Sequence, residues 1–308
     1  MIEVLTSVLP IFLLILLGWL LKRSPLLREY GWTALERLTY FVLFPCLLAT
    51  TLAEADFSEL PIKGIAAAII GAIVIVSLLL FAMRRFLFTD GPRFTSVYQG
   101  SVRMNTYVGL SIAATFYAET GLAAAALAIA IIVPLVNVAC VLMLAMYGNA
   151  AGNAARQGWQ GVLDAWVKNP LIIGSFIGLA LNISGLGLPP LVGPMAEILA
   201  EAALPLGLLA VGAALHFNAV LESGVVVLAT SVIKLVVLPL LTWGLLRLFG
   251  VEGVEADVAI LFNALPTATS AYILASQFGG DAKLMASIIS VETLLSMISL
   301  SALLAWLM

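Results

Sequence analysis

Long apolar runs, separated by short charged or turn-rich connections, make up most of the chain. Each run is close to the ~20 residues that a helix needs to cross a bilayer. None shows the strict polar–apolar alternation of a β-barrel strand. Charged and turn residues divide the chain into ten such runs, at about 4–22, 32–53, 63–84, 94–118, 121–147, 165–185, 189–215, 221–249, 254–278 and 283–308. The pattern predicts an all-α integral membrane protein with ten transmembrane helices.

The composition agrees with a membrane protein. Hydrophobic residues make up 63% of the chain and charged residues only 10%, whereas soluble proteins carry about 25% charged residues. Lipid must therefore cover much of the surface. The net charge of −3 and the absence of a basic or acidic tail argue against nucleic acid as a partner.

The distribution of Lys and Arg predicts the orientation, because cytoplasmic connections collect these residues. If the N-terminus is outside, the outer connections hold only Lys63 and Arg247. The inner ones then hold Lys22, Arg23, Arg28, Arg84, Arg85, Arg93, Arg156, Lys168 and Lys283. The sequence therefore predicts both termini on the outer side of an inner (plasma) membrane.

Five spans in each half place the second half in the opposite orientation to the first, as in an inverted repeat. The predicted repeats are 1–147 and 165–308, joined by a cytoplasmic linker at 148–164. A constant offset of 160 relates Pro10, Gly18 and Pro45 to Pro170, Gly178 and Pro205. These matches alone are weak evidence, but they agree with the count of spans.

Two cations are predicted to lie deep in the bilayer, where each becomes a candidate functional residue. Arg103 lies ten residues into its span, about 15 Å along a helix, and is expected to contact substrate or a half-helix, or else to form a structural ion pair. Lys234 must lose its proton, meet a carboxylate or lie against the carbonyl ends of a broken helix. In the third case it would stabilise a helix crossover; direct substrate binding is the alternative.

Three carboxylates are candidate proton carriers, because desolvation favours the protonated acid. Glu197 and Glu201 are four residues apart on one face of the seventh span and could reach Arg103 or Lys234. Glu292 lies in the tenth span. A salt bridge or an interfacial position is the simpler alternative for each of them.

The fourth and ninth spans are the least helix-like. Polar residues interrupt both, at Asn105 and Thr106 in one and at Asn263, Pro266 and Thr267 in the other. We predict that both helices are discontinuous, so that exposed N–H groups can hold an anion at mid-membrane. A proline kink in the ninth span and a continuous fourth helix are the alternatives.

The sequence lacks the residues that other kinds of chemistry require. The single histidine, His216, falls at a predicted helix end, and no Cys/His/carboxylate cluster predicts a metal site. All five Asp residues lie in or beside connections, and no phosphate-binding loop occurs. The sequence predicts no cofactor, no metal and no enzymatic activity.

Several motifs together resemble the auxin efflux carrier family, in its bacterial branch related to the plant PIN-type carriers. They are Arg103–Leu110, Asn169-Pro170 through Leu188-Pro189, Ala203–Gly212, Lys234–Pro239, Leu265–Ala268 and Gln277–Asp281. The resemblance covers essentially the whole chain. It implies two inverted five-helix repeats with crossed, broken helices four and nine, as in sodium/proton antiporters and bile-acid transporters, and a transport domain beside a scaffold domain. It also implies carriage of organic anions. Ser111, where the family commonly has Pro, and Glu292, where a small or hydroxyl residue is expected, depart from the pattern.

The leading hypothesis is a secondary transporter or facilitator for a small organic carboxylate, auxin-like or a dicarboxylate, that works by alternating access. Arg103, Asn105, Thr106, Asn263, Pro266 and Thr267 are the predicted substrate-binding residues. A ligand-binding receptor and a passive anion channel on the same fold are the alternatives. The sequence leaves open the carboxylate, the direction of transport, its coupling to protons or sodium, and the oligomeric state, a homodimer included.

Overall fold

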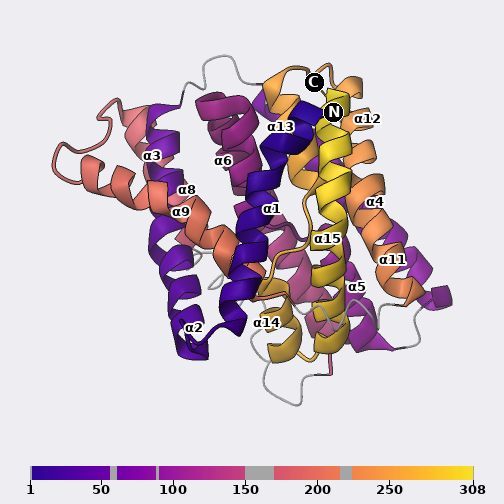
Figure 1. Ribbon diagram of the computed structural model, residues 1–308. Coiled ribbons are helices and arrows are strands. Elements are labelled where there is room, and N and C mark those ends of the chain that lie inside the picture. The colour runs from indigo at the N-terminus through magenta and orange to yellow at the C-terminus, as the bar shows by residue number, and fades with distance from the viewer. Residues whose placement is uncertain (1, 56–60, 88–89, 150–169, 216–223, 308) are drawn as a thin grey trace.

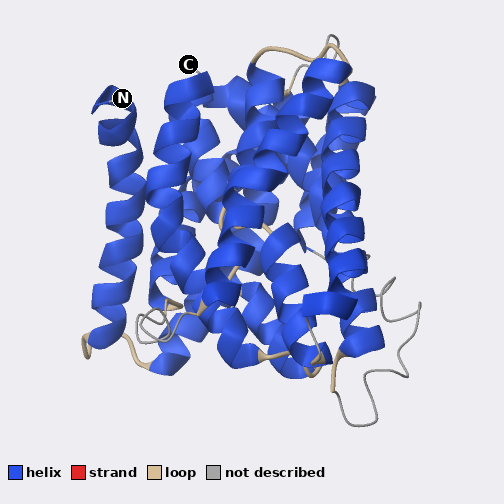
Figure 2. Ribbon diagram, turned by 90° about the vertical axis from the view of Figure 1, so that its right-hand side faces the viewer, coloured by secondary structure: helices blue, strands red, loops and turns tan. Residues whose placement is uncertain are grey.

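Helices form every regular element in the ranges that the structure, a computed structural model, describes: residues 2–55, 61–87, 90–149, 170–215 and 224–307. Figure 2 shows long helices running side by side. The all-α prediction is confirmed for these ranges. The helices are α1 (Ile2–Arg23), α2 (Glu29–Leu38), α3 (Phe44–Glu54), α4 (Ile62–Leu87), α5 (Gly91–Val102), α6 (Thr106–Tyr147), α8 (Pro170–Ser184), α9 (Gly193–Ala213), α11 (Val225–Val232), α12 (Leu238–Leu248), α13 (Val254–Ala264), α14 (Ser270–Gln277) and α15 (Ala282–Leu307), with π-helical turns η1 (Thr39–Leu43) and η3 (Ile233–Val237).

Seven helical stretches in the described ranges are long and apolar enough to cross a membrane. The count differs from ten for three reasons. The stretch Gly91–Tyr147 counts once although it covers two predicted spans, α8 is shorter than its predicted segment, and α13 and α14 are each too short alone. The arrangement as ten spans therefore stays a prediction.

A sharp turn divides α6 near the predicted boundary between the fourth and fifth spans. Ala118 has φ 48° and ψ −136°, so it leaves the helical conformation inside α6. Such dihedral angles are costly for a residue with a Cβ and persist only when the surroundings impose them. The turn fits the predicted segments 94–118 and 121–147.

Large apolar side chains cover the outside of the bundle. Leu20 of α1 is 51% exposed, Phe176 of α8 is 60% exposed and Ile298 of α15 is 73% exposed. A soluble monomer rarely exposes apolar patches of this extent. A hydrocarbon environment around the helices removes this cost, in agreement with the composition.

Both termini lie at the same end of the bundle (Figure 1). In this view α3, α8 and α9 lie on one side, and α4, α11 and α12 lie on the other. Between them, α6 and α13 approach the end with the termini, whereas α5 and α14 lie toward the opposite end. The broken fourth and ninth spans therefore pass through the middle of the molecule.

Two glycines allow close helix packing at related positions. A Cβ on Gly18 of α1 would lie 2.1 Å from the Leu209 carbonyl oxygen of α9, and one on Gly178 of α8 would lie 2.5 Å from the Ala49 carbonyl oxygen of α3. No side chain fits at either position without a shift of the backbone. The two contacts are related by the same offset of 160 residues in both partners.

A π-helical turn precedes a proline in two of the spans. Turn η1 ends at Leu43, two residues before Pro45, and η3 ends at Val237, two residues before Pro239. Because proline lacks an N–H and crowds the preceding turn, the wider π turn accommodates it inside a continuous span. In η3 this widened turn also carries Lys234.

Candidate functional site

The breaks in the fourth and ninth spans are directly joined. Residues 103–105 separate α5 from α6, and residues 265–269 separate α13 from α14. The Asn105 backbone N–H donates to the Pro266 carbonyl oxygen at 2.8 Å. The Thr267 hydroxyl donates to the Gly100 carbonyl oxygen at 2.8 Å. Both helices are therefore discontinuous. The alternatives, a continuous fourth helix and a simple proline kink in the ninth span, are wrong.

Asn105 caps the second half of the broken fourth span. Its Oδ1 accepts from the backbone N–H groups of Tyr107, at 3.1 Å, and Val108, at 3.4 Å, as a helix N-cap does. This fixes the orientation of the amide, so Nδ2 points away from the cap. That Nδ2 atom is buried and has no partner among the described residues. It is a preoriented donor at the positive end of a helix dipole.

Arg103 projects beside Asn105 and has only neutral partners in hydrogen-bond distance in the described ranges. Its Nη1 donates to Asn137 Oδ1 and its Nη2 to Ser270 Oγ, each at 3.1 Å, while Nε has no partner. The structural ion pair, the alternative for this residue, is thus absent from the described residues. A partly buried cation without a counter-ion favours binding of an anion.

A cavity of about 500 Å³ adjoins this break. Three predicted site residues line it: Arg103, Asn105 and Thr106. The opposite wall comes from α2 and η1 and carries Arg37 and Glu36. Other polar lining groups are Thr33, Tyr40, Asn137, Thr269 and Ser270, and the remaining wall is mainly apolar, from Ile132, Val133, Val136, Leu171 and Ile273. A mostly apolar cavity with a few convergent polar groups is typical of a small-molecule site.

Asn263, Pro266 and Thr267 lie on the other side of the crossing and do not line this cavity. The Asn263 Nδ2 donates to Thr242 Oγ1 at 2.7 Å, and its side chain is 1% exposed. The sequence pattern thus located both breaks, but the structure brings only the residues of the first one to the cavity.

Two buried ions flank the second break. The Lys234 Nζ donates to the Asn263 carbonyl oxygen at 3.1 Å, near the carboxyl end of α13. The Thr267 N–H donates to Glu292 Oε2 at 2.9 Å, just before α14. Both side chains are fully buried. A cation at the carbonyl end of one half-helix and a carboxylate before the amino end of the next both match the helix dipoles.

The two remaining predicted carboxylates lie elsewhere. Glu197 and Glu201 are both exposed on α9. Neither pairs with Arg103 or Lys234, whose partners are given above. The expectation that they reach these cations is wrong, since α9 directs this face outward. His216 falls outside the described residues.

Sequence reasoning missed three polar groups of the crossing: Asn137, Ser270 and Thr242. Asn137 is the amide within the apolar segment 121–147, and this isolated polar residue was a usable signal. Ser270 and Thr242 gave none, because Ser and Thr are common inside membrane helices, where they bond to the preceding turn. No cluster of three or more metal-binding side chains occurs in the described ranges.

Comparison of the sequence with known proteins shows which family the chain belongs to. A family model described as membrane transport protein matches residues 3–157 and 160–304. A protein of Methanothermobacter thermautotrophicus named "Uncharacterized transporter" is 26% identical over 298 residues, covering 96% of this chain and 95% of the relative. One of Rhizobium meliloti named "Putative malonate transporter" is 27% identical over 317 residues, covering 99% and 96%. Because the family match spans nearly the whole chain, this protein belongs to the membrane transport protein family, the auxin efflux carrier family that its motifs resemble, and is a multi-pass membrane protein.

Proposed function

We propose that the protein is a carrier for a small organic carboxylate, which binds in the 500 Å³ cavity at the first helix break. The observation that carries this proposal is the pairing of two unsatisfied donors in one cavity. Arg103 has no anionic partner among the described residues, and Asn105 Nδ2 has no partner at all among them. A carboxylate supplies the charge and the acceptors that these groups lack.

The charges around the cavity favour a dicarboxylate. Arg37 and Arg103 both line it, against the single carboxylate of Glu36. A substrate with two carboxylates can contact an arginine with one and the Asn105 amide with the other. Malonate is the first compound to test, since one relative is named for it. An auxin-like monocarboxylate, with its aromatic ring on the apolar wall, is the second.

Alternating access suits the position of the cavity. One wall belongs to α2, η1 and α8, and the other to the break before α6, to α6 itself and to α14 with the residues just before it. Movement of the second wall against the first would expose the site to each side in turn. The related contacts Gly18–Leu209 and Gly178–Ala49 support inverted repeats at 1–147 and 165–308 as the basis of this movement.

The buried ions of the second break have separate roles in this proposal. Lys234 stabilises the crossover because its ammonium donates to a carbonyl oxygen at the negative end of the α13 dipole. A transporter could otherwise hold a metal cation at this place. Glu292 is the fully buried carboxylate of the three candidates, and its Oε1 has no partner in the described ranges. We assign it the coupled proton; Glu197 and Glu201 are exposed and take no part.

Flux measurements test the proposal. Protein reconstituted in liposomes should take up labelled malonate with saturation, and unlabelled malonate inside should accelerate uptake. A channel would show flux without this acceleration, and a receptor would bind ligand without flux. Liposomes without protein are the control for leakage. Failure of a panel of mono- and dicarboxylates to produce counterflow would refute carboxylate transport.

A further inference from the structure

A second cavity, of about 340 Å³, lies far along the chain from the first break and shares none of its residues. It is formed by the end of α12, the start of α13 and the end of α15. Figure 1 places these three helix ends at the end of the bundle that holds both termini. This is also where an apolar span meets the aqueous phase.

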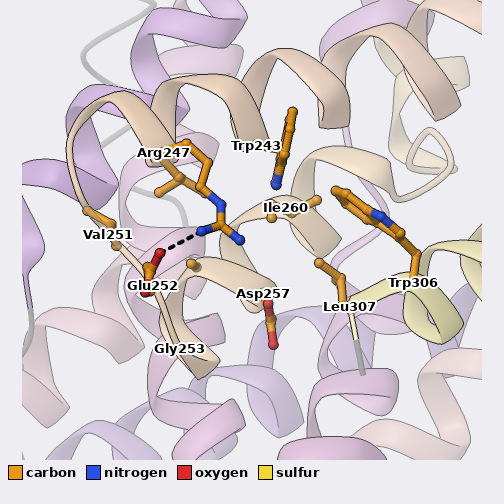
Figure 3. Close-up of a pocket in the computed structure, with 11 residues that line it drawn as sticks. Trp243, Arg247, Val251, Glu252, Gly253, Asp257, Ile260, Trp306 and Leu307 are labelled. Atoms are coloured by element: carbon orange, nitrogen blue, oxygen red, sulfur yellow. Dashed lines mark hydrogen bonds and ion pairs between the residues drawn. The ribbon is translucent and has the colours of Figure 1, made fainter.

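Two tryptophans form one side of this cavity. The rings of Trp243 and Trp306 meet edge to face with centroids 5.4 Å apart. They are 37% and 52% exposed, beside outward-facing Leu240 and Leu248 of α12. Figure 3 shows the two rings opposite the Arg247–Glu252 pair. Indoles at the end of an apolar helix are typical of the headgroup level of a bilayer, where a lipid headgroup can reach this cavity.

The other side of the cavity carries ions with an excess of one negative charge. Arg247 forms an ion pair with Glu252, and both side chains are largely exposed. Asp257, in the first turn of α13, adds a second carboxylate. Among the described residues, its Oδ2 accepts one long bond of 3.4 Å, from the Tyr117 hydroxyl. A ligand with a cation can pair with Asp257, and the same ligand can also offer an anion to Arg247.

Two glycines shape the turn between α12 and α13, which forms this side of the cavity. Gly250 and Gly253 have φ values of 66° and 88°, which side chains with a Cβ rarely adopt. Between these two turns the chain returns Glu252 to Arg247, one helical turn beyond Trp243. The arginine and the indole thus share one face of α12. The cationic, anionic and aromatic groups are held together by local geometry.

We propose that this cavity binds the headgroup of a phospholipid with a primary ammonium, of the phosphatidylethanolamine type. The ammonium contacts Asp257, the phosphate contacts Arg247, and the acyl chains lie along Trp243 and Trp306. The exposed Arg247–Glu252 pair can open for the phosphate because surface ion pairs contribute little. The lipid then ties the end of α12 to the end of α15.

Thermal unfolding of the full-length protein in detergent tests this proposal, with added phosphatidylethanolamine, phosphatidylglycerol or phosphatidylcholine. We expect phosphatidylethanolamine to raise the midpoint by about 2–4 °C more than the other two. Asp257→Asn should remove that preference, and Trp306→Leu, at the acyl chains, should reduce the shift with all three lipids. Glu54→Gln, which changes an exposed carboxylate of α3, should retain the preference.

Two outcomes would overturn the proposal: an equal shift with all three lipids, or an unchanged preference in Asp257→Asn. Native mass spectrometry of the same variants provides a second readout that does not depend on stability. Malonate counterflow should persist in Asp257→Asn, because this residue lies outside the substrate cavity. Failure of the lipid site and failure of carboxylate transport are therefore distinguishable.

Discussion

The Asn105 backbone N–H donates to the Pro266 carbonyl oxygen at 2.8 Å, and this bond joins two helix breaks through residues that lie 161 positions apart in the chain. The bond occupies main-chain groups only. It leaves the Asn105 side chain free to cap α6, and Nδ2 keeps no partner among the described residues. The crossing therefore holds the two breaks together without using the groups that we propose for substrate.

Neutralising Arg103 should weaken substrate binding without unfolding the protein, because its present partners are neutral. Loss of charge-assisted hydrogen bonds of about 1.5–3 kcal/mol corresponds to roughly 10- to 150-fold in affinity. Counterflow titrations with Arg103→Gln measure this change. Arg103→Lys should rescue only partly, since an ammonium lacks the planar fork. Arg23→Gln, whose side chain lies over the Trp19 ring, is the control, and an unchanged affinity in Arg103→Gln would remove Arg103 from the site.

Asn105→Asp should block anion binding while the helix cap remains. The carboxylate can still accept from the Tyr107 and Val108 N–H groups, but it replaces the free donor by a negative charge. Placing like charges together costs several kcal/mol, so we expect a loss of roughly 100-fold or more in affinity. Circular dichroism checks the fold and counterflow checks the affinity. Asn105→Asp with normal malonate affinity would contradict the proposed site.

A matched control comes from Asn182 of α8. Its Nδ2 donates to the carbonyl oxygens of Ala53 and Ala55, at 3.1 and 2.7 Å, at the end of α3. Asn182→Ala should therefore lower stability by about 1–3 kcal/mol. It should leave malonate affinity unchanged, because this residue does not line the cavity.

Lys234 and Glu292 should be coupled in stability. Lys234→Met leaves the Asn263 carbonyl oxygen without its donor in a fully buried region, at a cost of about 1–3 kcal/mol, and it removes the cation that acts electrostatically on Glu292. In the double variant with Glu292→Gln we expect part of this loss to return. A double-mutant cycle by thermal unfolding measures the coupling. Strictly additive effects would show that the two ions act independently.

Glu292→Gln should retain malonate exchange but lose the coupling of transport to protons. The amide can still accept from the Thr267 N–H through its oxygen, but it cannot release a proton. We expect an inward proton gradient to accelerate malonate uptake by the wild type and not by the variant, with counterflow retained in both. If the variant responds to the gradient as the wild type does, Glu292 is not the proton carrier. That result would not affect the proposal that the substrate carboxylate binds in the cavity at the first helix break.

The C-terminus should lie on the outer, periplasmic side of the inner membrane. A reporter fused after Met308 is expected to behave as periplasmic in a bacterium, because nine Lys and Arg residues fall in the opposite set of connections against two in this one. Both termini lie at one end of the bundle (Figure 1), so a fusion before Met1 should give the same result. Cytoplasmic fluorescence from intact fusions would reverse the predicted orientation.

The sequence by itself determined the helical membrane architecture and the two helix breaks. A run of apolar residues specifies burial in lipid, and Pro266 and Asn105 disturb the helix through their own backbone and side-chain chemistry. These properties depend on each segment alone. For Lys234 the sequence left three environments open, and the structure places its ammonium at the Asn263 carbonyl oxygen of another span.

Only the tertiary structure decided which groups meet. It turned Asn263 toward Thr242 and away from the cavity, brought Asn137 to Arg103, and left Glu197 and Glu201 exposed. The physical reason is that lipid-facing and helix-facing apolar residues look alike in sequence. Packing determines how each helix is rotated and which helices lie beside it. The close contact of Gly18 with Leu209 is one example. Packing therefore also determines which polar groups share a cavity.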